Sequence, residues 1–478
     1  MKFLKLSLAA SVALGALSTA SFAQSLEEAI KGVDVSGYLR YRYTDDRLND
    51  DYTNWNFGAK HQWKAQADLK TPVINNVAVN LGLLYTQDNN VNHGKGNGDS
   101  KYGDLAGEST LPDSSPNTGK GLGAGGDNSF NVQTFYATIT PDSTATVVTI
   151  GKQLINTPIT AASDGDRGTG IVATNSDIEG LTLAAAVFDS WASDDRTGYS
   201  LGKDKSDESI AKNLYGLGGV YNLETSFGNL GFQLWGFNIT DTADAIVFGE
   251  GSWKNDFLRA KLQYTFAALN NDEDSALILE AGSVGKHVDV AAENDLAIIE
   301  LGANFSTFSV PLDLRLGYMM NFMDGIAIAL NDDAENFTKA GKIWYDDSYV
   351  GFNTSIFNGG LADINWETEA KVIFGALGYS MVDDRLNLGL EAAYGNIEKT
   401  AGKDSKLAIA AAGGKKENSK DITMSDIKFV EVTPTISWKH SDKLNLSAFY
   451  AYLAAENDVK GSKDYDRQRV RFEAKYSF

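Results

Sequence analysis

Apolar and charged residues alternate along this chain in runs of about ten, and this period of two restricts its fold more than any other feature. The segment at the C-terminus is the clearest case. One face carries Val470, Phe472, Ala474, Tyr476 and Phe478, and the other carries Arg467, Arg469, Arg471, Glu473 and Lys475. Such a segment is typical of a strand with water on one side and an apolar environment on the other.

The same alternation recurs in residues 33–43, 60–70, 258–266, 310–320 and 386–394. Runs of about ten residues suit a tilted strand that crosses a bilayer, whereas strands of soluble proteins have about five or six. The most apolar uninterrupted stretches, Ile326–Leu330 and Leu407–Ala412, are far too short for a membrane-spanning helix. The remaining structure that pairs every backbone group inside a membrane is a closed barrel.

Connections between these segments are of two kinds, which is the asymmetry of outer-membrane barrels. Short ones include residues 71–76, 141–143, 177–180, 254–256, 383–384 and 441–442, and long ones include 87–128, 191–212, 322–367 and 396–426. If residues 276–284 and 349–357 belong to long external loops, the two kinds alternate throughout. The sequence therefore predicts an all-β, transmembrane antiparallel β-barrel of about 18 strands, with 16 as the alternative.

The first residues have the character of a secretory signal peptide. Lys2 and Lys5 precede an apolar stretch, and Ser21-Phe22-Ala23 suits cleavage before Gln24. Residues 1–23 are therefore predicted to be removed, which leaves 24–478 as a single barrel domain and changes the formal charge from −21 to −23. An N-terminal membrane anchor is the alternative.

A barrel of this size encloses more space than side chains fill, so a water-filled channel is expected. Basic side chains gather at the predicted inward positions of its wall: Arg40, Arg42, Lys64, Arg259, Lys261, Arg315, Arg467, Arg469 and Arg471. Each could also simply pair with a nearby carboxylate such as Asp34, Asp68 or Glu473.

The segment 155–170 is the candidate for a loop that folds inward and narrows this channel. It carries Asp164, Asp166 and Arg167 between glycines that permit tight bending. Acidic groups opposite a basic wall would create a transverse field across the pore. An ordinary surface loop is the alternative.

Several function classes are excluded by composition and motifs. The chain has no cysteine, so disulfides and thiolate metal sites are absent, and its negative charge disfavours nucleic acid as a partner. The sequence has no G-x-S-x-G, H-E-x-x-H or P-loop motif, and its four histidines are scattered. An enzyme is not expected, and no cofactor is required.

Particular residues resemble the Campylobacter-type major outer membrane porins. They are Leu26–Lys31 leading into Val33–Gly37 and Leu39–Tyr43; Gly151–Gln153, Asn156-Thr157, Asp164-Gly165, Gly168–Gly170 and Ile178–Ala185; and the terminal Phe472–Phe478. The likeness is specific at these points and extends plausibly over the mature chain.

The resemblance implies a homotrimeric porin of 18 strands in the outer membrane of a Gram-negative bacterium, in contact with lipopolysaccharide. It implies passive diffusion of ions and small hydrophilic solutes with a weak cation preference, and insertion by the barrel assembly machinery through Phe478. It also implies a constriction loop around Asp164, where family members hold Ca²⁺. Arg167 departs from a neutral position of the family pattern, and Asp166 partly offsets its charge.

Three other functions fit a barrel of this kind. A substrate-selective channel would need more aromatic residues along its path than Trp55, Trp235 and Phe237. A surface adhesin or structural barrel without an open pore would not conduct ions, and it is the main alternative. An outer-membrane hydrolase would need a serine and a histidine brought together at the rim.

Overall fold

The computed structural model describes residues 32–48, 59–91, 130–163, 165–192, 212–270, 291–330, 336–347, 349–356, 367–403 and 406–478. The predicted signal peptide, Asp164 and the predicted strand-like segment 276–284 lie outside these residues. Within them, no helix is long and apolar enough to cross a membrane.

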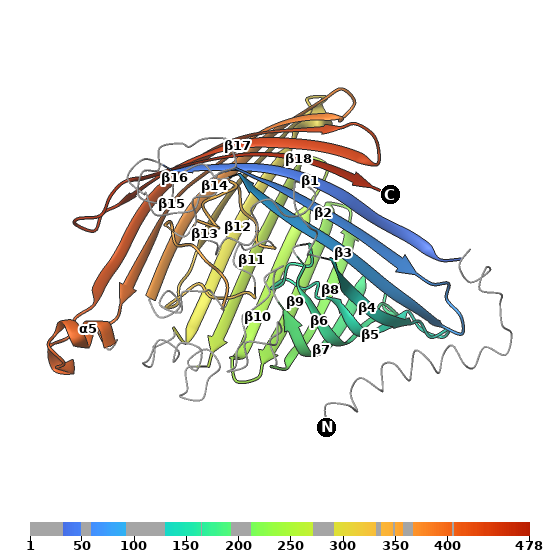
Figure 1. Cartoon of the computed structure of the whole chain (residues 1–478), viewed down its shortest axis with the longest axis horizontal. Coiled ribbons are helices and arrows are strands. Elements are labelled where there is room, and N and C mark those ends of the chain that lie inside the picture. Colours follow the sequence, from blue (N-terminus) through green and yellow to red (C-terminus); the bar gives the residue numbers. More distant parts are fainter. Residues whose placement is uncertain are drawn as a thin grey trace.

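Eighteen antiparallel strands form one closed sheet (Figure 1). In chain order they are β1 (Asp34–Leu48), β2 (Ala59–Lys70), β3 (Val77–Val91), β4 (Phe130–Ile139), β5 (Thr146–Leu154), β6 (Arg167–Asn175), β7 (Leu181–Ala192), β8 (Leu214–Thr225), β9 (Gly228–Ile239), β10 (Ala243–Lys254), β11 (Leu258–Leu269), β12 (Glu293–Asn304), β13 (Leu312–Met320), β14 (Glu367–Met381), β15 (Leu386–Ala401), β16 (Ile422–Lys439), β17 (Leu444–Asn457) and β18 (Tyr465–Ser477). Short helical turns are η2 (Phe305–Phe308), α5 (Lys406–Ala411) and η3 (Lys416–Asn418). The prediction of 18 strands is confirmed.

Each strand pairs with its sequence neighbours, and β1 pairs with β18 to close the barrel. The register sets Arg42 opposite Glu473 and Thr44 opposite Arg471. Phe478, the last residue, exchanges backbone hydrogen bonds with Gly37 at 3.1 and 3.2 Å. Closure leaves no open sheet edge, which is what a strand structure needs inside lipid.

The alternation of the sequence becomes the two faces of the wall. Leucines such as Leu217, Leu234 and Leu301 are 57–67% exposed on the outer surface. Inward positions are polar and covered, as with Gln263 at 2% and Thr265 at 0% exposure. This is the arrangement of a barrel with an apolar outside and a polar inside.

Short turns gather at the end of the barrel that holds both chain ends. Asp177, in the turn between β6 and β7, accepts hydrogen bonds from the Thr144 hydroxyl and the Ala145 amide, each at 2.5 Å, and from Asn175 at 2.6 Å. These donors stabilise the carboxylate, the Thr144 hydroxyl most, and they hold the pKa of Asp177 below its usual range. The turn is thereby joined to the neighbouring hairpin.

Two predicted connections are corrected at the opposite end. The connection predicted over 396–426 is shorter, because β15 continues to Ala401 and β16 begins at Ile422. The hairpin of β9 and β10 needs only residues 240–242, so long and short connections do not alternate strictly. Single-sequence periodicity missed both because strands that rise above the membrane lose the apolar outer face that marks them.

Candidate functional site

The described residues of the connection between β13 and β14 lie inside the barrel rather than outside it. We call residues 321–330, 336–347 and 349–356 the inner loop; its trace follows β13 within the ring of strands in Figure 1. Nine of its apolar residues are at most 2% exposed: Ile328, Ala329, Leu330, Ala340, Ile343, Trp344, Val350, Phe352 and Ile356. The prediction that residues 349–357 form an external loop is therefore wrong for 349–356, because these apolar side chains pack against the inner wall.

A buried carboxylate on β16 holds the backbone of the inner loop. Glu431 is 0% exposed and accepts hydrogen bonds from the amides of Lys342, Ile343 and Trp344 at 2.5, 3.1 and 2.8 Å. The Thr433 hydroxyl donates a fourth bond at 2.7 Å. A buried carboxylate is stable only when its oxygens are satisfied in this way. Glu431 thus fixes the position of one turn of the loop.

The neighbouring strand adds a second carboxylate. Glu391 on β15 accepts the Gly341 amide at 2.8 Å and pairs with the Lys342 ammonium at 2.7 Å. Gly341 has a φ of +105°, which a side chain would strain, so the turn that presents these amides favours glycine. The segment 341–344 is therefore held by two strands at once.

Aromatic stacking continues the attachment. The Trp344 ring stacks on Phe429 of β16 with centroids 5.3 Å apart, and it meets Phe352 at 4.9 Å. The Phe429 ring lies close to the backbone of Gly395, the facing residue on β15. A Cβ added to Gly395 would be 2.7 Å from the Phe429 ring, so only glycine leaves room for it. Gly317 on β13 stands in the same way opposite Phe374 on β14. Glycine opposite an aromatic ring keeps the ring against the wall and leaves room for the loop.

The substitution Gly395→Val is expected to displace the inner loop. The new side chain would push Phe429 off the wall and into Trp344, and overpacking of this kind costs about 1–3 kcal/mol. Intrinsic fluorescence of Trp344, compared in the wild type and in a Trp344→Phe background, reports the displacement. Gly236→Val, on the outer face of β9 where an added Cβ meets nothing within 4 Å, is the control for a glycine replaced elsewhere. An unchanged Trp344 signal in folded Gly395→Val protein contradicts the packing described here.

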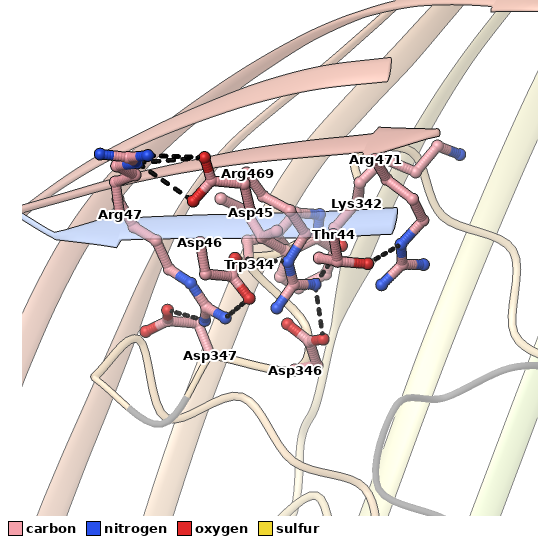
Figure 2. Close-up of polar contacts among 12 residues, drawn as sticks. Thr44, Asp45, Asp46, Arg47, Lys342, Trp344, Asp346, Asp347, Arg469 and Arg471 are labelled. Carbon is pink, nitrogen blue, oxygen red and sulfur yellow. Dashed lines mark hydrogen bonds and ion pairs between the residues drawn. The ribbon is translucent and has the colours of Figure 1, made fainter. Parts of the chain in front are cut away.

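Ion pairs attach the next turn of the inner loop to the seam between β18 and β1 (Figure 2). Arg467 donates to Asp347 at 2.5 Å, and Arg469 bonds Asp346 at 3.0 Å. Asp46 of β1 lies between the two arginines, 2.7 Å from Arg469 and 3.4 Å from Arg467. We call these five residues the seam cluster. The side chains of Asp46, Asp347, Arg467 and Arg469 are covered, so their pairs are shielded from solvent and salt, whereas Asp346 is about one-third exposed.

Tyrosines flank the seam cluster. The Tyr465 hydroxyl donates to Asp347 at 2.9 Å, and the Tyr465 ring stacks on Tyr349 with centroids 4.4 Å apart. Asp347 is 1% exposed, yet its carboxylate has an arginine and a hydroxyl as partners. These contacts attach the inner loop to β15, β16 and β18 by charge, hydrogen bonds and packing.

The loop predicted to narrow the channel is shorter than expected and lies against the inner loop. It spans 155–166, because β6 already begins at Arg167. Leu330 donates its amide to the Ile159 carbonyl at 2.8 Å, and the Asn336 amide bonds the Thr157 carbonyl at 3.0 Å. Ile155, Ile159 and Ala161 are buried. The prediction of an inward fold holds for the described part of this segment, but the larger inward segment is the inner loop.

The charged residues predicted for this loop separate in space. Asp166 is 1% exposed, and its carboxylate accepts the Ala161 amide at 2.6 Å, so it braces the loop. Arg167 is placed away from the lumen: it shares a strand face with Ile171, which is 49% exposed on the outer surface. Its guanidinium donates to the Gly165 carbonyl at 3.0 Å. Asp164 lies outside the described residues.

Most of the predicted basic wall lies on the inner face and is paired. Arg42 bonds Glu473 at 2.7 Å, the bidentate Arg259–Asp313 pair has both distances at 2.6 Å, and Lys261 and Arg315 lie 3.7 and 3.4 Å from Glu250 and Glu300. Arg467 and Arg469 belong to the seam cluster, while Arg40 faces Lys64 across β1 and β2. Arg471 has no carboxylate within ion-pair distance among the described residues; its contacts are the Thr44 hydroxyl and the Phe449 ring. The wall is therefore less basic in sum than its arginines suggest.

The sequence held one signal of the inner loop. Ile326–Leu330 is an apolar run inside a connection that should have been external and polar. Its length excludes a membrane helix, and burial inside the barrel is the remaining reason for such a run. Glu391 and Glu431 carried no such signal, because inward acidic residues are ordinary in a polar lumen.

Calcium at the constriction stays a prediction, because Asp164 lies outside the described residues. Within the described part of the chain, no group of three or more His, Asp or Glu side chains could hold a metal ion. Asp166 fits such a role poorly, since its carboxylate is used by the backbone of its own loop.

Comparisons with known proteins agree with this geometry. The family model of the Campylobacter major outer membrane protein matches residues 1–478. No curated protein matches the chain significantly. Similar solved structures, each 13% identical in sequence, include OccAB1 of Acinetobacter baumannii, with a TM-score of 0.58 and coverage of 93% of this chain and 97% of that one. OpdL of Pseudomonas aeruginosa has a TM-score of 0.57 and coverage of 94% of this chain and 99% of that one. OpdK of Pseudomonas aeruginosa with vanillate has a TM-score of 0.53 and coverage of 93% of this chain and 99% of that one. At this identity the structures show a shared fold.

Proposed function

Because this chain belongs to the Campylobacter major outer membrane protein family and is an outer-membrane porin, we propose that it is a general diffusion channel for ions and small hydrophilic solutes, narrowed chiefly by the inner loop. The observation that carries the proposal is a closed 18-stranded barrel whose inner face is lined by paired charges such as Arg259–Asp313 and Arg315–Glu300. Side chains of this kind favour water and hydrated solutes over lipid. Family and fold point to a channel without catalysis.

A weak cation preference is part of the proposal. The formal charge of −21, or −23 after removal of residues 1–23, attracts cations to the channel mouth. The wall contributes little net field, because most of its arginines and lysines are matched by carboxylates. The preference should therefore be modest and should weaken as salt screens the mouth.

The test is a single-channel recording of purified, unboiled protein in a planar bilayer with a potassium chloride gradient. We expect stepwise openings and a small reversal potential of the sign for cations, which decreases toward zero when both salt concentrations are raised tenfold at a constant ratio. If the reversal potential does not change with salt concentration, the selectivity arises at the constriction of the channel and not at its mouth. Absence of conductance from folded protein would favour a surface adhesin or structural barrel.

Assembly is proposed on the family resemblance. A homotrimer predicts openings in groups of three in the same recordings. The terminal Phe478, paired with Gly37 at the end of an alternating strand, suits recognition by the barrel assembly machinery. Contact with lipopolysaccharide follows from the outer-membrane location.

A further inference from the structure

Below the seam cluster, basic side chains gather on the inner face of β18, β1 and β2. The register places Arg42 opposite Glu473, and Arg40 opposite both Lys475 and Lys64. Arg471 lies one inward position above Glu473 on the same strand. Among these residues Glu473 is the single carboxylate, and it is already bound to Arg42 at 2.7 Å. We call Arg40, Arg42, Lys64, Arg471 and Lys475 the cationic patch.

Arg471 is held at the upper edge of this patch by groups that do not neutralise it. Its Nε donates to the Thr44 hydroxyl at 3.3 Å, and its guanidinium lies 5.3 Å from the centre of the Phe449 ring. In Figure 2 the dashed line from Arg471 runs to Thr44, and none joins it to Asp46, Asp346 or Asp347. Those carboxylates are occupied by Arg467 and Arg469.

We propose that Arg471 is the centre of a binding station for small organic carboxylates that cross the lumen, an inference that rests on the proposed channel function. The two terminal nitrogens of a guanidinium match the two oxygens of a carboxylate. Thr44 and Phe449 fix the plane of the guanidinium before a solute arrives, so less conformational freedom is lost on binding. The rest of the cationic patch raises the local concentration of anions.

The position of the station explains how a channel with an acidic mouth could still pass organic anions. The seam cluster matches three carboxylates with two arginines, whereas at the next inward position of β18 Arg471 has no carboxylate within ion-pair distance among the described residues. Arg471 therefore lies directly beside the place where the inner loop is attached to the wall. The station also requires a carboxylate: a neutral solute of the same shape gains none of the charge-assisted bonds.

The experiment measures block of the potassium chloride current through the full-length protein by benzoate, with benzamide as the neutral probe of the same shape. We expect benzoate to reduce the current in a saturable way and benzamide to have little effect. Arg471→Gln should raise the half-blocking benzoate concentration about tenfold, the loss of a charged hydrogen bond of about 1.4 kcal/mol. Lys443→Gln, which removes one positive charge from an exposed turn, should leave it unchanged.

Equal block by benzamide, or an unchanged half-blocking concentration in folded Arg471→Gln protein, overturns the station. If that variant does not fold, Arg471→Lys keeps the charge and removes the planar fork, and it should weaken benzoate block by a smaller factor. Saturation-transfer NMR of benzoate with detergent-purified protein separates the two proposals. If the protein does not conduct but binds benzoate in the NMR experiment, and Arg471→Gln abolishes that binding, the open channel is rejected and the binding station is supported. If the protein conducts but shows no such binding, the channel is supported and the binding station is rejected.

Discussion

Replacing Asp346 and Asp347 together with asparagine is expected to release the inner loop from the seam and to increase the single-channel conductance. The substitutions remove the main carboxylate partners of Arg467 and Arg469, which are themselves only 6% exposed. Removing one partner of a fully buried ion pair costs about 3–5 kcal/mol, and the loss here should be smaller because Asp46 still pairs with both arginines. Conductance and current noise in a planar bilayer measure the release.

The matched control for this pair is Asp442→Asn. Asp442 lies in an exposed turn and pairs with Lys439, so its loss changes the net charge without touching the lumen. Hydrogen bonds and attraction from Lys439 hold the pKa of Asp442 below its usual range, so it is charged under the recording conditions. If the double variant folds and conducts as the wild type does, the seam cluster does not position the inner loop.

Glu431→Ala is expected to have the second large effect, on stability. The change leaves three inner-loop amides, those of Lys342, Ile343 and Trp344, without their acceptor in a buried place. Each buried unsatisfied group costs about 1–3 kcal/mol, so a loss of several kcal/mol in the docking free energy of the loop is expected. The fluorescence of Trp344 should report the undocked loop, and the midpoint of heat-induced unfolding in detergent should fall.

Glu431→Gln tests the same contact more finely. It keeps an acceptor oxygen and the side-chain volume, so its effect should lie between those of the wild type and Glu431→Ala. Glu417→Ala, at the exposed η3 turn, controls for loss of an acidic residue outside the barrel. Wild-type unfolding in Glu431→Ala would show that the aromatic contacts hold the loop without the carboxylate.

The wall of the barrel could be predicted from sequence because each strand carries its own signal. Val470 and Phe472 are exposed on the outside while Arg467 and Arg469 are covered inside, as a period of two requires. Each strand contacts lipid on one face and water on the other, so each strand shows the alternation. The alternation does not depend on which strands are its neighbours.

The inner loop could not be predicted in the same way, because its contacts join residues far apart in sequence. Trp344 needs Phe429, and Asp347 needs Arg467, and neither pair has a regular spacing. Arg167 shows the converse error: its charge suggested the lumen, but the register of β6 turns it outward. Local composition reports whether a residue can be buried, whereas the register decides on which side of the wall it lies.

The seam cluster also relates the pore to the order of assembly. Asp46 belongs to the first strand of the barrel, and Arg467 and Arg469 belong to the last. These residues become neighbours only when β1 and β18 pair, at the moment the sheet closes. The complete attachment for Asp346 and Asp347 therefore does not exist in an open sheet. The inner loop can therefore take its final position in the lumen only after the barrel closes. In a barrel that has not closed, the inner loop lacks the complete seam cluster.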